Sequence, residues 1–157
     1  MVTAWRIVKT KHARDAFDGM GAHHYGGRWN NIGTSLVYLG GSPALAFLET
    51  LVHLDDSGII PAYSIFEVTI PPPLIEAVNR SMLPPDWHET PAPPTLAAIG
   101  DAWIASQRSI ALEVPSAVVP IESNYLLNPS HPDFTSVGIG PERPFPFDGR
   151  IVSRLIK

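Results

Sequence analysis

Three consecutive prolines, Pro71-Pro72-Pro73, place the firmest limit on how this chain folds. Proline has no backbone N–H to donate to a sheet ladder, so the strand predicted over residues 62–70 must end there. The chain stays rich in proline up to Pro94. We expect this segment to be either a loop packed over the surface or a flexible segment, and long loops in small domains often act as lids.

The other segments alternate irregularly between strand and helix patterns. Short apolar and β-branched runs predict strands at 5–8, 36–39, 110–115, 122–127 and 150–156. Helical patterns cover 12–17, 43–54 and 95–106, and a loop is expected through residues 23–25. A parallel doubly wound sheet would need regular β-α alternation, which this order lacks. The pattern therefore predicts an α+β domain.

Length and composition indicate one ordinary folded domain spanning residues 1–157. Hydrophobic residues make up 45% of the chain and charged residues 17%, which argues against disorder. There is no cysteine, so disulfides and thiolate metal sites are excluded. The N-terminus lacks the apolar core of a signal peptide, and no run approaches the roughly 20 apolar residues of a membrane span. We expect a soluble, cytoplasmic protein with no membrane association.

Charge is unevenly distributed along the chain. Residues 1–30 carry five Lys or Arg and two Asp, a net charge of +3. Because the whole chain has a net charge of -4, residues 31–157 carry -7. A basic opening segment in an acidic chain can hold one small anionic ligand, whereas binding to nucleic acid usually needs a basic stripe. Direct nucleic acid binding is disfavoured.

The predicted helix at 43–54 contains one carboxylate in an otherwise apolar surface. Ser42 can cap the helix and Pro43 suits its first position. Apolar residues cover most of its circumference, so we expect a well-buried helix. Glu49 must then be paired, protonated or exposed in a pocket, because an uncompensated buried carboxylate costs several kcal/mol. His53 lies on the same helix face, so the two are either an exposed surface pair or part of a cleft.

The sequence Gly26-Gly27-Arg28 is a second candidate for binding chemistry. Adjacent glycines allow a sharp turn or a close approach to a ligand, and arginine can fork onto phosphate or carboxylate. The alternative is a surface arginine held by a nearby carboxylate. Tyr38, in the strand that follows, is either a core aromatic residue or a ring that stacks on a planar ligand.

Two other kinds of chemistry find no support in the residue spacing. His23 and His24 have no third ligand at a recognisable distance along the chain, so we expect no metal site. Ser116 is not part of a GxSxG turn, and no serine-hydrolase triad can be assembled.

The chain resembles the RES domain family, named for arginine, glutamate and serine and found in toxins of RES-Xre toxin-antitoxin modules. The resemblance covers nearly the whole chain. The segments in which the chain resembles the family are WRI at 5–7, GGRWNNIGTSLVYLGGSPALAFLETLVHL at 26–54 and PSAVVPIESNYLLNPSHPDF at 115–134. In the second block arginine, tyrosine, glutamate and histidine follow the family's order and spacing.

The resemblance implies a mixed or antiparallel sheet core with a few flanking helices, similar to ADP-ribosyltransferases, and an activity that consumes NAD+. By position, Glu49, Arg28 and Tyr38 match the family's active-site residues. Glu49 would stabilise an oxocarbenium-like centre, Arg28 would grip the pyrophosphate or a ribose, and Tyr38 would stack near the nicotinamide.

Further NAD+ contacts implied by the resemblance are Arg6, Asn30, His53 and Ser116. Ser116 is favoured as the family serine, with Ser123, Ser130 and Ser136 as alternatives.

The resemblance also implies a bacterial toxin of a type II module that depletes NAD+, with an Xre-like helix-turn-helix antitoxin as its partner. Water, inorganic phosphate and a protein side chain all remain open as the acceptor. They correspond to a glycohydrolase, a phosphorylase and an ADP-ribosyltransferase. A different class of protein is also open, a non-catalytic binding module in which Arg28 and Glu49 form a buried ion pair.

Overall fold

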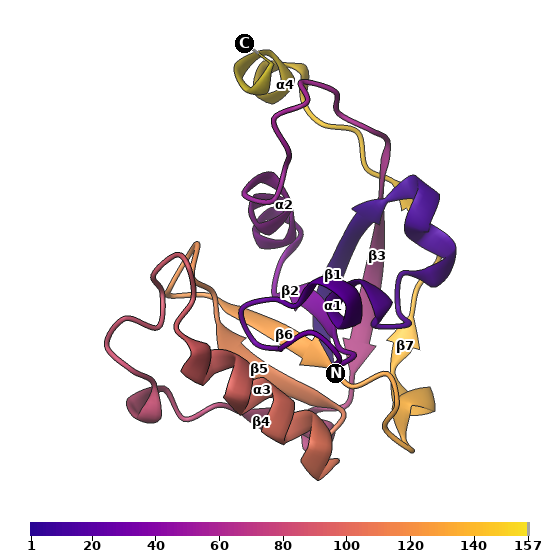
Figure 1. Ribbon diagram of the computed structural model, residues 1–157. Coiled ribbons are helices and arrows are strands. Elements are labelled where there is room, and N and C mark those ends of the chain that lie inside the picture. Colours follow the sequence, from indigo (N-terminus) through magenta and orange to yellow (C-terminus); the bar gives the residue numbers. More distant parts are fainter. Residues whose placement is uncertain (157) are drawn as a thin grey trace.

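Eight strands form one mixed sheet in the computed structural model, which describes residues 1–156 (Figure 1). The strands are β1 Val2–Lys9, β2 Val37–Gly40, β3 Tyr63–Ile70, β4 Ile75–Ala77, β5 Ala111–Pro115, β6 Ser123–Leu127, β7 Gly138–Ile139 and β8 Arg143–Pro144. Their order across the sheet is β4-β5-β6-β2-β1-β3-β7, with β8 also pairing with β3. Only the β4–β5 pair is parallel. The expectation of an α+β domain with a mixed sheet is confirmed.

Helices are few and lie around this sheet. The α-helices are α1 Met20–Tyr25, α2 Pro43–Leu51, α3 Pro94–Ser106 and α4 Gly149–Leu155. Short 3-10 helices are η1 Thr10–Asp15, η2 Pro72–Leu74, η3 Arg80–Met82 and η4 Phe134–Ser136. Helix α3 runs alongside β4, β5 and β6, whereas α4 lies at the periphery, away from the sheet (Figure 1). None of the helices in residues 1–156 has the length and apolar character needed to cross a membrane.

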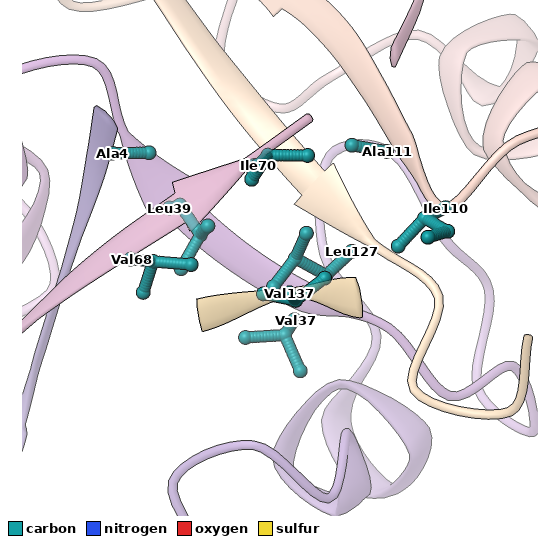
Figure 2. Packing of buried hydrophobic residues seen from close by; sticks show 9 residues of the cluster. All are labelled: Ala4, Val37, Leu39, Val68, Ile70, Ile110, Ala111, Leu127 and Val137. Carbon is teal, nitrogen blue, oxygen red and sulfur yellow. The ribbon is translucent and has the colours of Figure 1, made fainter. Parts of the chain in front are cut away.

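Apolar side chains pack on both faces of the sheet. Figure 2 shows the first cluster, in which side chains from β1, β2, β3, β5 and β6 meet around Val137. The second cluster joins Leu112, Val114 and Leu126 to Trp103 of α3 and to Trp29. Successive residues of a strand face opposite sides, so Val37 and Leu39 belong to the first cluster while Tyr38 packs against the second.

The two central strands, β1 and β2, are joined much less closely than β1 and β3. Eight residue pairs connect β1 to β3, whereas Trp5 opposite Gly40 is the one pair that connects β1 to β2. The guanidinium of Arg6 takes the place of a ladder bond there, donating through Nη1 to the Tyr38 carbonyl at 3.1 Å. Backbone pairing in the sheet is therefore sparse between β1 and β2, where the Arg6 side chain also joins the two strands.

Two predicted elements were wrong in type. Residues 150–156 were expected to be a strand, but Gly149–Leu155 form helix α4, because Asp148 accepts a hydrogen bond from the Arg150 amide and caps a helix. The apolar residues Ile151, Val152, Leu155 and Ile156 also fit a helical period. Residues 23–25, expected in a loop, belong to α1, which begins after Gly19 in the left-handed conformation.

Helix α2 is shorter and more exposed than expected. It ends at Leu51, since the amides of His53 and Leu54 bond three residues back and tighten the chain out of the helix. Leu45 and Ala46 are buried, but Leu48 is 39% and Val52 58% exposed. The prediction of a well-buried helix was wrong because only one side of α2 packs on the sheet.

The proline-rich segment packs against the rest of the fold. It contributes strand β4, which the sequence did not predict, as a parallel partner of β5. Leu83, Trp87 and Ala92 also pack against the second cluster. Of the two alternatives for this segment, the packed loop is the one that the structure contains.

Candidate functional site

Glu49 is held at one of its two carboxylate oxygens. The Ser116 hydroxyl donates to Oε1 at 2.8 Å, and the Asn124 amide Nδ2 donates to the same oxygen at 2.7 Å. Within residues 1–156, Oε2 makes no hydrogen bond and Glu49 forms no ion pair. The carboxylate is thus fixed in orientation while one oxygen stays available to a ligand.

Ser116 is placed by the turn that follows β5. Its hydroxyl oxygen accepts hydrogen bonds from the amides of Val118 at 3.1 Å and Val119 at 3.0 Å. A serine hydroxyl has one proton, so with its oxygen occupied by two amides that proton goes to Glu49. Ser116 is fully buried, so the arrangement is sheltered from competing water.

The alternative serines lie elsewhere. Ser123 donates to the Glu113 carboxylate at 2.7 Å, and the Ser130 amide donates to Asn128 at 3.0 Å. Ser136 lies in η4. Among the four candidates, Ser116 is the one whose hydroxyl contacts Glu49.

Asn124 was not predicted as a site residue. It lies on β6 opposite Gly40 and shares a sheet face with Leu126. Its Oδ1 is buried and finds no hydrogen-bond partner among residues 1–156. The available signal was weak: asparagine is uncommon in strands, and here the alternation with Leu126 turns it inward.

Gly40 allows helix α2 to pack closely against strand β2. A Cβ atom at residue 40 would lie 2.6 Å from the backbone nitrogen of Ala46, which no ordinary contact permits. The absence of a side chain therefore allows α2 to approach β2 closely and brings Glu49 over the end of β6.

Arg28 is held by backbone carbonyl groups of the proline-rich segment. Its Nη1 donates to the carbonyls of Trp87 at 3.0 Å and Glu89 at 2.8 Å. It forms no ion pair with any carboxylate in residues 1–156, so both the surface-pair reading and the Arg28–Glu49 ion pair are contradicted. Neutral carbonyl oxygens satisfy hydrogen bonds but leave the net positive charge available to an anion.

Tyr38 fixes the turn that carries Arg28. Its hydroxyl donates to Asn30 Oδ1 at 2.7 Å and accepts from the Trp29 amide at 3.0 Å. Asn30 is buried and donates onward to the carbonyls of Ala22 and Thr34. Burial raises the pKa of Tyr38, and the Trp29 hydrogen bond opposes this shift in part. The hydroxyl is therefore neutral at physiological pH.

Gly27 also lies against Tyr38. A Cβ at residue 27 would be 2.5 Å from the tyrosine oxygen, so the turn requires glycine at this position. The turn bearing Arg28 rests on residue 38 of β2 and the helix bearing Glu49 rests on residue 40. Residues two apart on a strand share a face and are roughly 7 Å apart. Strand β2 thus supports the turn that bears Arg28 and the helix that bears Glu49 at neighbouring positions on one face.

Arg6 lies on the opposite face of β1, with Ala4 and Val8. Besides its bond to Tyr38, its Nε donates to the Ala16 carbonyl at 3.1 Å. Burial lowers the pKa of Arg6 to about 10, and Asp18 opposes the shift. Arg6 remains charged at neutral pH and contacts the backbone of the site residue Tyr38 rather than the Glu49 side.

His53 follows the end of α2 and is exposed. No hydrogen bond joins it to Glu49 in the described residues, although the two are four positions apart.

A surface hollow of about 480 Å³ lies at the β3–β7 edge, between Glu67 and Arg143, and none of Arg28, Tyr38 or Glu49 lines it. No cluster of three potential metal ligands occurs in residues 1–156.

This arrangement suits chemistry at a cationic carbon next to an anionic group. A fixed carboxylate with a free oxygen can stabilise developing positive charge or accept from a sugar hydroxyl. An arginine with uncompensated charge can hold a phosphate or carboxylate.

Comparisons with known proteins agree with one family. The family model described as RES domain matches residues 3–148. A protein of Yersinia enterocolitica named "Toxin Res" is 40% identical over 148 residues, which cover 94% of this chain and 97% of that protein. A protein of a Sphingobium strain named "Prs ADP-ribosylating toxin" is 37% identical over 155 residues, covering 96% of each.

A solved structure shares the fold. The toxin-antitoxin complex MbcT-MbcA of M. tuberculosis contains a chain that matches this one with a TM-score of 0.70 and 17% identity, covering 98% of this chain and 87% of that chain.

Proposed function

This chain belongs to the RES domain family, and we propose that it is the toxin of a toxin-antitoxin module that cleaves the nicotinamide–ribose bond of NAD+. The observation that carries the proposal is the state of Glu49, whose Oε1 is fixed by two donors while Oε2 is free. The relatives of this chain that are named as toxins support the proposed role as a toxin.

The bond cleavage places positive charge where Glu49 can act. The electron pair of the glycosidic bond leaves with the nicotinamide nitrogen, which becomes neutral, and C1 of the ribose becomes oxocarbenium-like. A carboxylate oxygen beside that carbon stabilises the charge as it forms. Oε2 is the oxygen we assign to this role.

Arg28 is assigned to the pyrophosphate of NAD+. No carboxylate in residues 1–156 forms an ion pair with Arg28, and the carbonyls of Trp87 and Glu89 occupy only one of its two terminal nitrogens with short bonds. The remaining N–H groups are suited to phosphate oxygens. Tyr38 and Asn30 support this assignment by fixing the turn; stacking of Tyr38 on nicotinamide, and contacts of Arg6 and His53 with NAD+, stay predictions.

The acceptor of the ADP-ribosyl group distinguishes three reactions. Attack by water forms ADP-ribose and releases one proton. Attack by inorganic phosphate forms ADP-ribose 1''-phosphate. Both release nicotinamide and deplete NAD+, so the first half of the reaction is common to them.

Transfer to a protein side chain is the second candidate function. The relative named "Prs ADP-ribosylating toxin", at 37% identity, favours it. This transfer requires the same cleavage of the nicotinamide–ribose bond, assisted by Glu49. A protein nucleophile, rather than a small molecule, then attacks the ribose carbon.

We further propose that this toxin acts in the cytoplasm and is neutralised by an antitoxin of the Xre-like helix-turn-helix type. The shared fold with a chain from a toxin-antitoxin complex supports the existence of such a partner.

The test is to incubate the purified protein with NAD+ and measure nicotinamide, with and without inorganic phosphate, and to identify the second product by mass. ADP-ribose, its 1''-phosphate and a modified protein from added cell extract differ in mass. Release of nicotinamide under the first two conditions supports NAD+ degradation. Release that needs cell extract assigns the protein to the second candidate, and no release under any condition refutes both.

A further inference from the structure

The side chain of Asn124 uses one half of its amide and leaves the other half without a partner. Its NH₂ group donates to Glu49 Oε1 at 2.7 Å, whereas its buried Oδ1 accepts no hydrogen bond from residues 1–156. This orientation is set by the carboxylate, which accepts hydrogen bonds and faces the donor end of the amide.

An unpartnered buried acceptor is unfavourable compared with the same group in water. A smaller side chain such as alanine at residue 124 would remove that loss. Asparagine therefore contributes something other than fold stability at this position. Its one hydrogen bond in the described residues goes to Glu49.

One donor to Glu49 lies in the turn after β5 and the other on β6, and their surroundings differ. Ser116 is saturated, with two amides bonded to its oxygen and its proton bonded to Glu49. Ser116 alone tethers the carboxylate to the turn after β5. A second donor from β6 fixes the rotation of the carboxylate about that tether and so determines where Oε2 points.

We propose that Asn124 is the positioning residue that orients the free oxygen of Glu49 for bond cleavage. This inference rests on the proposed function. In this role Asn124 acts through Glu49: one N–H of its NH₂ group donates to Oε1, and its Oδ1 is buried.

A positioning role and a merely structural role predict different kinetics. If Asn124 only tethered α2, its loss would lower stability and leave the turnover of the folded protein unchanged. If it orients Glu49, its loss lowers kcat with little change in KM, because the interaction serves the transition state rather than substrate binding.

The chain offers a matched control on the same strand. Ser123 neighbours Asn124 on β6 and faces the opposite side, where its hydroxyl donates to the Glu113 carboxylate at 2.7 Å. Ser123→Ala thus removes a hydrogen bond from a neutral donor to a carboxylate, as Asn124→Ala does, without touching Glu49.

The experiment compares Asn124→Ala, Asn124→Asp and Ser123→Ala in steady-state nicotinamide release, with thermal unfolding of each purified protein. We expect Asn124→Ala to lower kcat about 10-fold and Asn124→Asp about 100-fold, with KM within about twofold, because Asp cannot donate and repels Glu49. Ser123→Ala should keep wild-type kcat. If Asn124→Asp does not fold, Asn124→Ala decides the outcome.

Wild-type kcat in a folded Asn124→Ala variant would overturn the inference, and so would a loss confined to KM. Nicotinamide release by the wild type separates this failure from failure of the proposed function. A wild type that arrests growth without releasing nicotinamide, with or without cell extract, refutes the proposed NAD+ chemistry and with it the role assigned to Asn124. A wild type that does neither overturns both.

Discussion

Glu49 and Arg28 are held by different kinds of structure. The carboxylate is fixed by Ser116, in the turn that directly follows β5, and by Asn124 on β6. The guanidinium is fixed by carbonyls of residues 87 and 89, in the segment that the prolines keep irregular. The sheet thus sets the geometry of the negative charge and a surface loop sets that of the positive charge.

This difference matches the role proposed for each group. Stabilising charge on a reacting carbon demands accurate placement, because its benefit falls steeply with misorientation. Gripping a phosphate at the far end of a ligand tolerates adjustment, and loops adjust more easily than strands. We therefore expect substitutions around Glu49 to lower kcat and substitutions around Arg28 mainly to raise KM.

Removing the guanidinium gives the largest effect on substrate binding. Arg28→Ala should lower kcat/KM for NAD+ about 100-fold, mostly through KM, since hydrogen bonds to charged groups contribute about 1.5–3 kcal/mol each. Arg28→Lys keeps the charge but has three N–H donors instead of five and no planar fork, so after bonding both carbonyls it has one donor for a ligand and should recover only part of the loss. Steady-state kinetics of nicotinamide release measure both.

Arg80→Ala is the matched control for Arg28. Arg80 also lies in the proline-rich segment and donates to a backbone carbonyl, that of Pro120, at 3.1 Å. It should keep wild-type kinetics. A loss at Arg28 that appears in kcat alone would contradict the division of roles between the two regions.

Removing the serine donor tests the Glu49 region. Ser116→Ala should lower kcat about 10- to 30-fold with little change in KM, because one hydrogen bond to a carboxylate is lost while Asn124 remains. Ser109→Ala is the comparison: this buried serine bonds Trp103 and the Ala111 carbonyl, so its loss should reduce stability and spare kcat. Equal kcat losses in both variants would point to a general loosening of the fold.

The Tyr38 hydroxyl links the two regions through the turn at Arg28. Tyr38→Phe leaves the Trp29 amide and Asn30 Oδ1 without their partner, which should lower the free energy of unfolding by about 1–3 kcal/mol. Urea denaturation measures the change. Tyr25→Phe, at an 86% exposed tyrosine, should be neutral. An unchanged stability in Tyr38→Phe would show that the turn does not depend on this hydroxyl.

The smallest effect concerns alkaline pH. Burial raises the pKa of Tyr38 above the value of about 10 expected in the unfolded chain. Above that pH the unfolded state loses the proton first, so stability falls, by at most about 1.4 kcal/mol per pH unit for this group. The stability difference between wild type and Tyr38→Phe should be constant below pH about 10 and narrow above it. A difference that grows above pH 10 would contradict the assigned direction.

Much of the core was predictable because its periodicity is clear. The runs at 36–39 and 62–70 form central strands, and Ser42 caps α2 as expected, accepting from the Leu45 amide. Helix α4 was missed because the short apolar run at 150–156 fits either period, and the deciding contact is the Asp148 cap. Strand β4 was missed because its pairing with β5 is a tertiary contact between distant segments.

The site was predictable as a set of residues but not as an arrangement. The isolated carboxylate in α2 singled out Glu49, and Gly-Gly before Arg28 marked the turn. Nothing in the sequence indicated that carbonyls of the proline-rich segment bond Arg28, or that Asn124 bonds Glu49, because both contacts join segments more than 50 residues apart. Such contacts depend on strand order, which local patterns do not determine.

The most direct test of the account is the single-turnover rate of nicotinamide release by wild type and by Glu49→Gln, with the enzyme in saturating excess over NAD+. Glutamine keeps an oxygen for both donors and replaces only the charge, so the fold and NAD+ binding should persist. We predict a rate lower by a factor of about 10³, the size expected for losing a charge opposite a developing cation. A folded Glu49→Gln protein that releases nicotinamide at the wild-type rate would contradict the central role of this carboxylate.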